Sequence, residues 1–127
     1  HKRAGKEVVP VDLELNRDGR ILIISGPNAG GKTICLKTVV LLQMMLQSGL
    51  LVPASEISEM GIFNSLMIDI GDAQSIEYEL STYSSHLKTL KYFIDYADQH
   101  TLFCIDELGT GTDPALGGAF AEVVLEE

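Results

Sequence analysis

The segment Gly26–Thr33, with the sequence GPNAGGKT, constrains this chain more than any other feature. It satisfies the pattern GxxxxGK[ST], in which glycines let backbone N–H groups close around phosphate oxygens. The pattern is informative only between a strand and a helix. An aliphatic run, Arg20–Ser25, precedes it, and an apolar segment without internal Gly or Pro, Lys32–Gln47, follows it. The sequence therefore predicts a phosphate-binding loop.

Each residue type in this loop has an expected chemical role. Lys32 would neutralise the β- and γ-phosphates, and Thr33 would contribute a hydroxyl ligand to magnesium. The helix that follows would point the positive end of its dipole at the same anion. The predicted ligands are ATP and Mg²⁺, and the predicted binding residues are Gly26, Pro27, Asn28, Ala29, Gly30, Gly31, Lys32 and Thr33. The alternative, a chance match in a glycine-rich turn, is rare at average glycine usage.

A second chemical signal lies near the end of the chain, where the apolar run Leu102–Ile105 is followed by Asp106 and Glu107. In nucleotide-binding proteins a carboxylate at the end of a strand reaches the magnesium ion beside the phosphate loop. Asp106 is the candidate metal ligand, and Glu107 is the candidate base that accepts a proton from the attacking water or orients it. Alone, such a strand end is more often ordinary; the loop upstream favours the functional interpretation.

The residues before the loop predict a hairpin. Apolar residues alternate with others over Val9–Leu15, the period of a half-buried strand, and Pro10 favours an edge position. Asn16–Gly19 supplies turn chemistry, and Arg20–Ser25 is typical of a buried parallel strand. We expect an antiparallel hairpin that leads into a central strand.

The remaining pattern predicts helices and one short strand. A short strand is possible at Leu66–Ile70 within a segment that is otherwise loop. Thr82–Ala97 repeats apolar residues at helical spacing, with Ser81 placed to cap its N-terminus. His86 on this helix is interpreted as structural rather than catalytic. A last helix is expected from about Ala115.

Composition narrows the class of protein. A chain of 127 residues with 46% hydrophobic residues suits one domain with one core. The formal net charge of -9 repels phosphate backbones, so we do not expect the chain to bind nucleic acid unaided. Cys35 and Cys104 have neither metal-ligand spacing nor disulfide density, which favours a reduced, cytoplasmic setting. No apolar run approaches the roughly 20 residues that cross a bilayer, so no membrane partner is expected.

The loop sequence resembles that of the MutS family, whose members favour Gly-Pro-Asn followed by paired glycines. Further segments resemble the second bacterial MutS subfamily, which lacks mismatch-recognition domains; they are Asp69–Ile76, Leu80–His86 and Asp106–Pro114. The similarity runs from about Val8 to Glu127. It implies an α/β fold, a P-loop NTPase of the ABC-ATPase type, with a mostly parallel sheet flanked by helices and an N-terminal antiparallel hairpin. Residues 1–127 would form a single, truncated MutS-type ATPase domain.

The resemblance also implies roles and partners. The ATPase domains of this family dimerise, so Ser81 would act in trans on the γ-phosphate of the opposing subunit, and Val9 would contact adenine. Asp72 and Gln74 fall where nucleotide state is coupled to neighbouring domains. The whole protein would be a nucleotide-driven homodimeric clamp on DNA or ribosomal RNA, acting in DNA repair and recombination control through further domains that include an Smr endonuclease.

Two departures from the family pattern affect this interpretation. Thr33 stands where mismatch-repair relatives have Ser, and either hydroxyl can bind magnesium. The chain stops before the family's switch histidine, so this fragment alone is expected to be weakly active or inactive. The alternative functions are a non-hydrolytic nucleotide-sensing dimerisation module and the head of another ABC-type ATPase, whose Leu-Ser-Gly-Gly-Gln signature Leu80–Tyr83 does not match.

Overall fold

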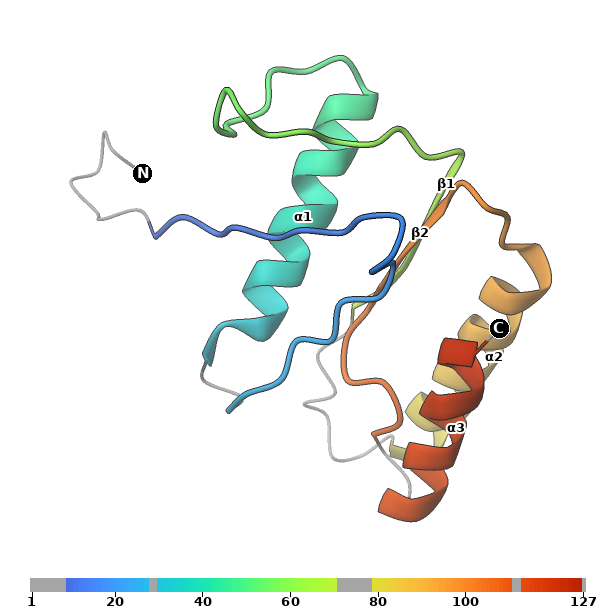
Figure 1. Cartoon of the computed structure of the whole chain (residues 1–127). Coiled ribbons are helices and arrows are strands. Elements are labelled where there is room, and N and C mark those ends of the chain that lie inside the picture. The colour runs from blue at the N-terminus through green and yellow to red at the C-terminus, as the bar shows by residue number, and fades with distance from the viewer. Residues whose placement is uncertain (1–8, 28–29, 71–78, 111–112, 127) are drawn as a thin grey trace.

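The structure is a computed structural model of the chain, and it describes residues 9–27, 30–70, 79–110 and 113–126. Within these ranges, helices and strands alternate along the chain (Figure 1). The elements are α1 (Lys32–Gln47), β1 (Ser65–Asp69), α2 (Glu79–Tyr96), β2 (Thr101–Ile105) and α3 (Pro114–Glu126).

The strands β1 and β2 pair in parallel, in a register that runs from Ser65 opposite Thr101 to Asp69 opposite Ile105. Parallel strands need a long crossover connection, and α2 provides it here. The carboxyl ends of both strands consequently meet at one edge of the sheet. Asp69 and Asp106, the last residue of β1 and the first residue after β2, are therefore neighbours, and the Asp106 N–H donates to the Asp69 carbonyl over 2.9 Å.

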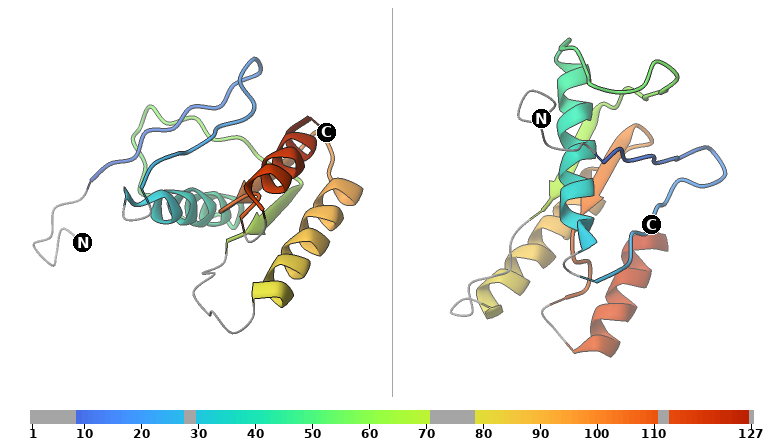
Figure 2. Two further views of the ribbon diagram at one scale, coloured as in Figure 1. Left: turned by 90° about the horizontal axis from the view of Figure 1, so that it is seen from below. Right: turned by 90° about the vertical axis from the view of Figure 1, so that its left-hand side faces the viewer.

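The helices lie on both sides of the strands. Figures 1 and 2 show α1 on one side and α2 with α3 on the other. Leu90 and Phe93 of α2 lie three residues apart, so they share a helix face, and they pack with Met67 of β1 in the buried core. Burial of each such side chain contributes roughly 1.5–3 kcal/mol. Ile105 and Leu108 pack against the same cluster, which ties the end of β2 to α2.

Two glutamines dock α1 on the loop that leads into β1. Gln47 pairs with the backbone of Phe63, since its Oε1 accepts from the Phe63 N–H over 3.0 Å and its Nε2 donates to the Phe63 carbonyl over 3.2 Å. Gln43, one turn earlier and only 3% exposed, donates to the Gly61 carbonyl over 2.8 Å and to Gln47 Oε1 over 2.7 Å. The Gln47 side chain thus makes the pair of hydrogen bonds with the Phe63 backbone that a neighbouring strand would otherwise make. We name this set the glutamine clamp.

The predicted hairpin before the loop is wrong, although its turn is confirmed. Asn16 Oδ1 accepts from the N–H groups of Asp18 and Gly19 over 2.9 and 2.7 Å, and the Asn16 N–H donates to the Gly19 carbonyl. In the part of the chain that the structure describes, no further backbone bonds join Val9–Leu15 to Arg20–Ser25. Both segments are exposed and outside any strand. The side-chain pattern suited strands, but no partner ladder forms to hold them.

The predicted fold class is therefore not what the structure has. A P-loop NTPase of the ABC-ATPase type would need a mostly parallel, many-stranded sheet and an N-terminal antiparallel hairpin. The described residues instead form a small α/β unit of two parallel strands and three helices. The physical reason is that Arg20–Ser25, expected as the central strand, does not pair with β1 or β2.

Other predicted elements are confirmed within a few residues. The helix Lys32–Gln47 has the expected bounds, and α3 begins one residue before the expected start. The strand after Asn64 covers Ser65–Asp69. Helix α2 begins at Glu79 rather than Thr82, so Ser81 lies in its first turn and does not precede it as a cap. None of the helices in the described ranges is long and apolar enough to span a membrane.

Candidate functional site

The glycine-rich loop leads directly into α1. Gly26 and Gly31 have φ values of 149° and 82°, a region that favours glycine because it lacks a Cβ. The Gly30 N–H donates to the Pro27 carbonyl over 2.8 Å and closes a turn. Asn28 and Ala29 lie outside the described residues. The sequence thus has glycine at the two loop positions whose backbone conformation other residues rarely adopt.

Lys32 is the first residue of α1, and its Nζ donates to the Gly26 carbonyl over 2.6 Å. The ammonium group therefore folds back over the loop that precedes it. The N–H groups in the first turn of a helix have no intrahelical acceptor, and they carry the positive end of the helix dipole. No acidic residue in the first turn of α1 neutralises that end. Lys32 and Thr33 consequently lie where a helix is suited to receive an anion.

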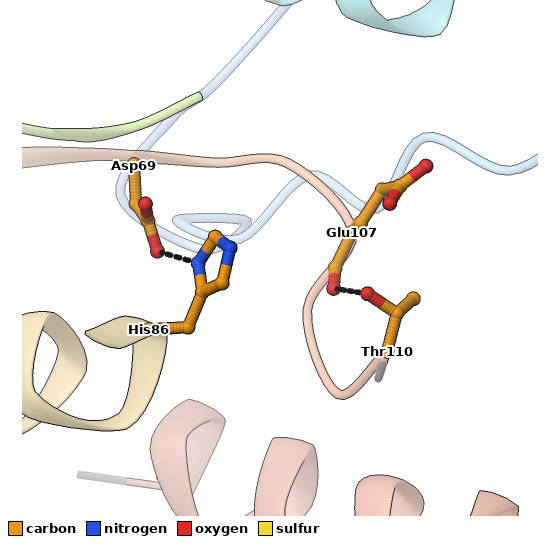
Figure 3. Close-up of polar contacts among 4 residues, drawn as sticks. All are labelled: Asp69, His86, Glu107 and Thr110. Atoms are coloured by element: carbon orange, nitrogen blue, oxygen red, sulfur yellow. Dashed lines mark hydrogen bonds and ion pairs between the residues drawn. The ribbon is translucent and has the colours of Figure 1, made fainter. Parts of the chain in front are cut away.

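The predicted strand-end carboxylates, Asp106 and Glu107, directly follow β2. Asp106 is half-buried, whereas Glu107 is exposed and has a φ of 54°, which is uncommon for a residue other than glycine. Thr110 holds this turn, because its Oγ1 and its N–H donate to the Glu107 carbonyl over 2.9 and 3.1 Å. In Figure 3 the Glu107 carboxylate points away from Thr110 and from Asp69.

A contact that the sequence interpretation missed joins α2 to this turn. Nδ1 of His86 lies 2.7 Å from Oδ2 of Asp69, and the pair is partly buried, with 34% of the His86 side chain and 14% of the Asp69 side chain exposed (Figure 3). The sequence interpretation gives His86 a structural role on this helix and names no partner for it. The available signal was the position of Asp69, since polar side chains at the carboxyl ends of parallel strands often gather in sites.

These residues surround a small cavity of about 20 Å³, which is enough for one water molecule. Its walls come from β1, α2 and the turn after β2, and include Asp69, His86, Asp106, Glu107 and Thr110. The structure therefore gathers the two predicted carboxylates with the Asp69–His86 pair.

The other predicted residues are not gathered there. The described part of the glycine-rich loop does not line the cavity, and Val9 is 81% exposed on the N-terminal segment. The Ser81 side chain, Asp72 and Gln74 lie outside what the structure describes. Among the described residues, no group of three or more His, Cys, Asp or Glu is placed to hold a metal ion. The roles of Thr33 and Asp106 as magnesium ligands, and the other assigned roles, stay predictions.

Comparison with known proteins identifies the family. The family profile described as MutS domain V matches residues 22–127. The chain is 50% identical over its full length to Endonuclease MutS2 of Carboxydothermus hydrogenoformans and 53% identical over 95% of its length to that of Pelotomaculum thermopropionicum. A protein of the same name from Levilactobacillus brevis is 49% identical over 96% of the chain. The chain spans 15% to 16% of the length of these relatives.

The match also corrects the expected fold class, because it assigns the region to MutS domain V, whose described residues here form a small α/β unit of two parallel strands and three helices. The resemblance in the loop and in the segments downstream, by contrast, is confirmed. The profile covers most of the chain, and the relatives with high identity share one subfamily name. The chain therefore belongs to the MutS domain V family, within the MutS2 subfamily.

Proposed function

We propose that this chain binds the phosphates of Mg²⁺-ATP through Gly26–Thr33 and supports ATP hydrolysis in its full-length protein. The observation that carries the proposal is the sequence GxxxxGK[ST] directly before α1, with Lys32 as the first residue of that helix. Two glycines in this loop take positive φ values, and the helix start carries no acidic side chain to repel phosphate. Backbone amides, helix dipole and ammonium group would then act on one anion.

The proposed roles follow from chemical type. Thr33 and Asp106 offer the hydroxyl and carboxylate oxygens that Mg²⁺ prefers, and the ion would supply charge neutralisation of the phosphates when bound. Glu107 is exposed and its carboxylate points away from Asp69 and Thr110 (Figure 3), so it is available to accept a proton from water. Val9 is exposed enough to contact a base, and Ser81 would act from a second subunit of a homodimer.

The name of these relatives, Endonuclease MutS2, suggests that the full-length protein acts on nucleic acid. We propose that this chain is its nucleotide-dependent part and that DNA or ribosomal RNA contacts other parts of the protein. The net charge of -9 supports this division, because a surface of that sign repels a phosphate backbone. A cytoplasmic setting stays a prediction from the two unpaired cysteines.

Isothermal titration calorimetry of the full-length gene product with Mg²⁺-ATP tests the proposal. Lys32→Ala should weaken binding by tenfold or more, since charge-assisted hydrogen bonds to phosphate contribute roughly 1.5–3 kcal/mol. Lys37→Ala is the matched control, because it removes the same charge from an exposed position on the same helix. No heat of binding with the unmodified protein, or equal affinity for the two variants, would reject the proposal.

A second candidate function is a nucleotide-sensing dimerisation module that does not hydrolyse ATP. One observation favours this function. Among the described residues, the glycine-rich loop does not line the cavity whose wall includes Asp106 and Glu107. The Glu107→Gln variant separates the two functions. Hydrolysis predicts retained binding with turnover lower by roughly 10²–10⁴-fold, the usual contribution of a general base. Equal turnover of variant and unmodified protein would favour sensing.

A further inference from the structure

Asp69 makes two contacts at once at the sheet edge. Its carbonyl accepts the Asp106 N–H over 2.9 Å, which is the backbone bond that continues the pairing of β1 and β2 beyond the end of β2. Its carboxylate receives Nδ1 of His86 over 2.7 Å. One residue thus connects the backbone of Asp106 with the side chain of a helix (Figure 3).

The chemistry of this pair fixes the orientation of the imidazole ring. An ionised carboxylate only accepts hydrogen bonds, so Nδ1 of His86 carries the proton that it donates to Asp69. The partial burial of both side chains, 14% and 34% exposed, limits competition from water. The ring is therefore held against the cavity that Asp106, Glu107 and Thr110 also line.

The position of His86 along α2 places the Asp69–His86 contact within two turns of Ser81. Ser81 lies five residues earlier on the same helix, and a helix rises about 1.5 Å per residue, so roughly 7.5 Å of axial distance separates them. Packing of Leu90 and Phe93 on Met67 holds the following part of α2 to the sheet. In the first half of the helix, the Asp69–His86 pair provides a corresponding attachment.

We infer that His86 is a positioning residue, which acts through Asp69 to hold the turn carrying Asp106 and Glu107 in a fixed relation to α2. The inference rests on the proposed nucleotide function for its consequence, because these two carboxylates are the proposed metal ligand and base. Loss of the contact frees the turn and the start of α2 to move independently. Small displacements of reacting groups are costly, since an error of about 1 Å can lower a rate by roughly a hundredfold.

Steady-state kinetics of the full-length gene product tests the consequence. His86→Leu should lower kcat by roughly ten- to a hundredfold while the KM for Mg²⁺-ATP stays within about twofold, because His86 lies outside the proposed phosphate-binding loop. His86→Asn, which retains an N–H donor close to the position of Nδ1, should restore most of kcat. His100→Leu makes the same change at an exposed turn and should leave both constants unaltered.

A double-variant comparison tests the route through Asp69. Asp69→Ala should lower kcat about as much as His86→Leu. The double variant should be no slower than either single variant, because both substitutions remove the same contact. The inference would be overturned if the reductions in kcat caused by the two substitutions multiplied in the double variant. It would also be overturned if His86→Asn were as slow as His86→Leu.

Hydrogen exchange tests the positioning without reference to ATP. In His86→Leu, the amides of 106–110 should exchange faster while those of the glutamine clamp stay as protected as before. Unchanged exchange at 106–110 would overturn the positioning inference but not the proposed function. Absence of ATP binding and turnover in the unmodified protein overturns the proposed function, whereas faster exchange in that case still supports the positioning contact. If His86→Leu fails to fold, His86→Asn and Asp69→Ala provide the same comparison.

Discussion

Gly109 lies in the turn after β2, close to the backbone of α3. Its φ is 80°, and an added Cβ would lie 2.5 Å from the carbonyl oxygen of Gly117, a backbone atom of α3. Neither conformation nor space therefore admits a side chain. Asp113 fixes α3 in this place, since its Oδ1 accepts from the Ala115 N–H over 2.9 Å at the start of the helix.

We predict that Gly109→Ala loosens α3 from the turn that carries Asp106 and Glu107. A non-glycine residue in a left-handed or strained conformation costs of the order of 1–3 kcal/mol, and displacement of α3 adds to that. Hydrogen exchange of the α3 amides in the full-length gene product should accelerate by about tenfold or more, since 1.4 kcal/mol corresponds to a factor of ten.

Gly118→Ala is the matched control for this substitution. Gly118 also lies in the α3 region, but a Cβ there meets nothing within 4 Å and its φ is not positive. Alanine in a helix interior is favoured over glycine by up to about 1 kcal/mol, so exchange in α3 should slow or stay unchanged. Equal acceleration in both variants would contradict the role given to the Gly109 contact.

At the scale of secondary-structure elements, the glutamine clamp attaches α1 to the loop before β1. We predict that Gln47→Leu exposes the Phe63 backbone to faster hydrogen exchange, because both its N–H and its carbonyl lose their partner. Both bonds are exposed to solvent, so water can take the place of the lost partner, and each bond is worth about 0.5–1.5 kcal/mol. Met44→Leu, a volume-conserving change at a half-exposed position on the same helix, is the control. Unchanged protection at Phe63 in Gln47→Leu would show that the clamp is dispensable.

The amino ends of β1 and β2 are joined by Asp98. The His100 backbone N–H is the main cause that lowers the pKa of the Asp98 carboxyl below its ordinary value of 3.8, followed by the side chains of Asn64 and Thr101. A lowered pKa means that the stabilising contribution is present above the ordinary value and is lost as pH falls through the folded-state pKa.

We therefore predict that the contacts of Asp98 with Asn64, His100 and Thr101 weaken as the pH falls below 3.8. Carbon-13 NMR of the carboxyl group should show Asp98 titrating below its ordinary value. The protection factors of the Asn64 and His100 amides, measured relative to their intrinsic exchange rates, should fall over the same pH interval, and Asp98→Ala should remove that pH dependence. An Asp98 midpoint at or above 3.8 would contradict the assigned contacts.

Elements that depend on local sequence were predictable, and those that depend on a distant partner were not. The bounds of α1 follow from Lys32 at its start and Ser48-Gly49 at its end, both local signals. The turn at Asn16 is likewise local. Arg20–Ser25 has the residue types of a buried strand, but strand formation needs a neighbouring ladder that composition does not specify. The Asp69–His86 contact spans 17 positions and depends on the parallel register, so no local pattern indicated it.

At the scale of the whole molecule, the exposed surface is large for the mass. The chain exposes 10464 Å² at 13.8 kDa, whereas a compact monomer of this mass exposes about 6,600 Å². Exposed apolar side chains follow one another on the N-terminal segment, where Ile21–Ile24 are all exposed and Ile23 is 73% exposed. Continuous apolar surface of this kind marks a face that another surface covers.

We predict that residues 1–127 expressed alone bind a hydrophobic dye such as ANS and self-associate as their concentration rises. Burial of apolar surface is worth roughly 25 cal/mol per Å², so association of these segments lowers the free energy. Ile23→Lys should reduce both dye binding and the mass measured by light scattering, because it places a charge in the exposed run. Thr38→Lys, on α1 outside that run, is the control. A dye-free monomer at all concentrations would show that the exposed aliphatic run needs no covering surface.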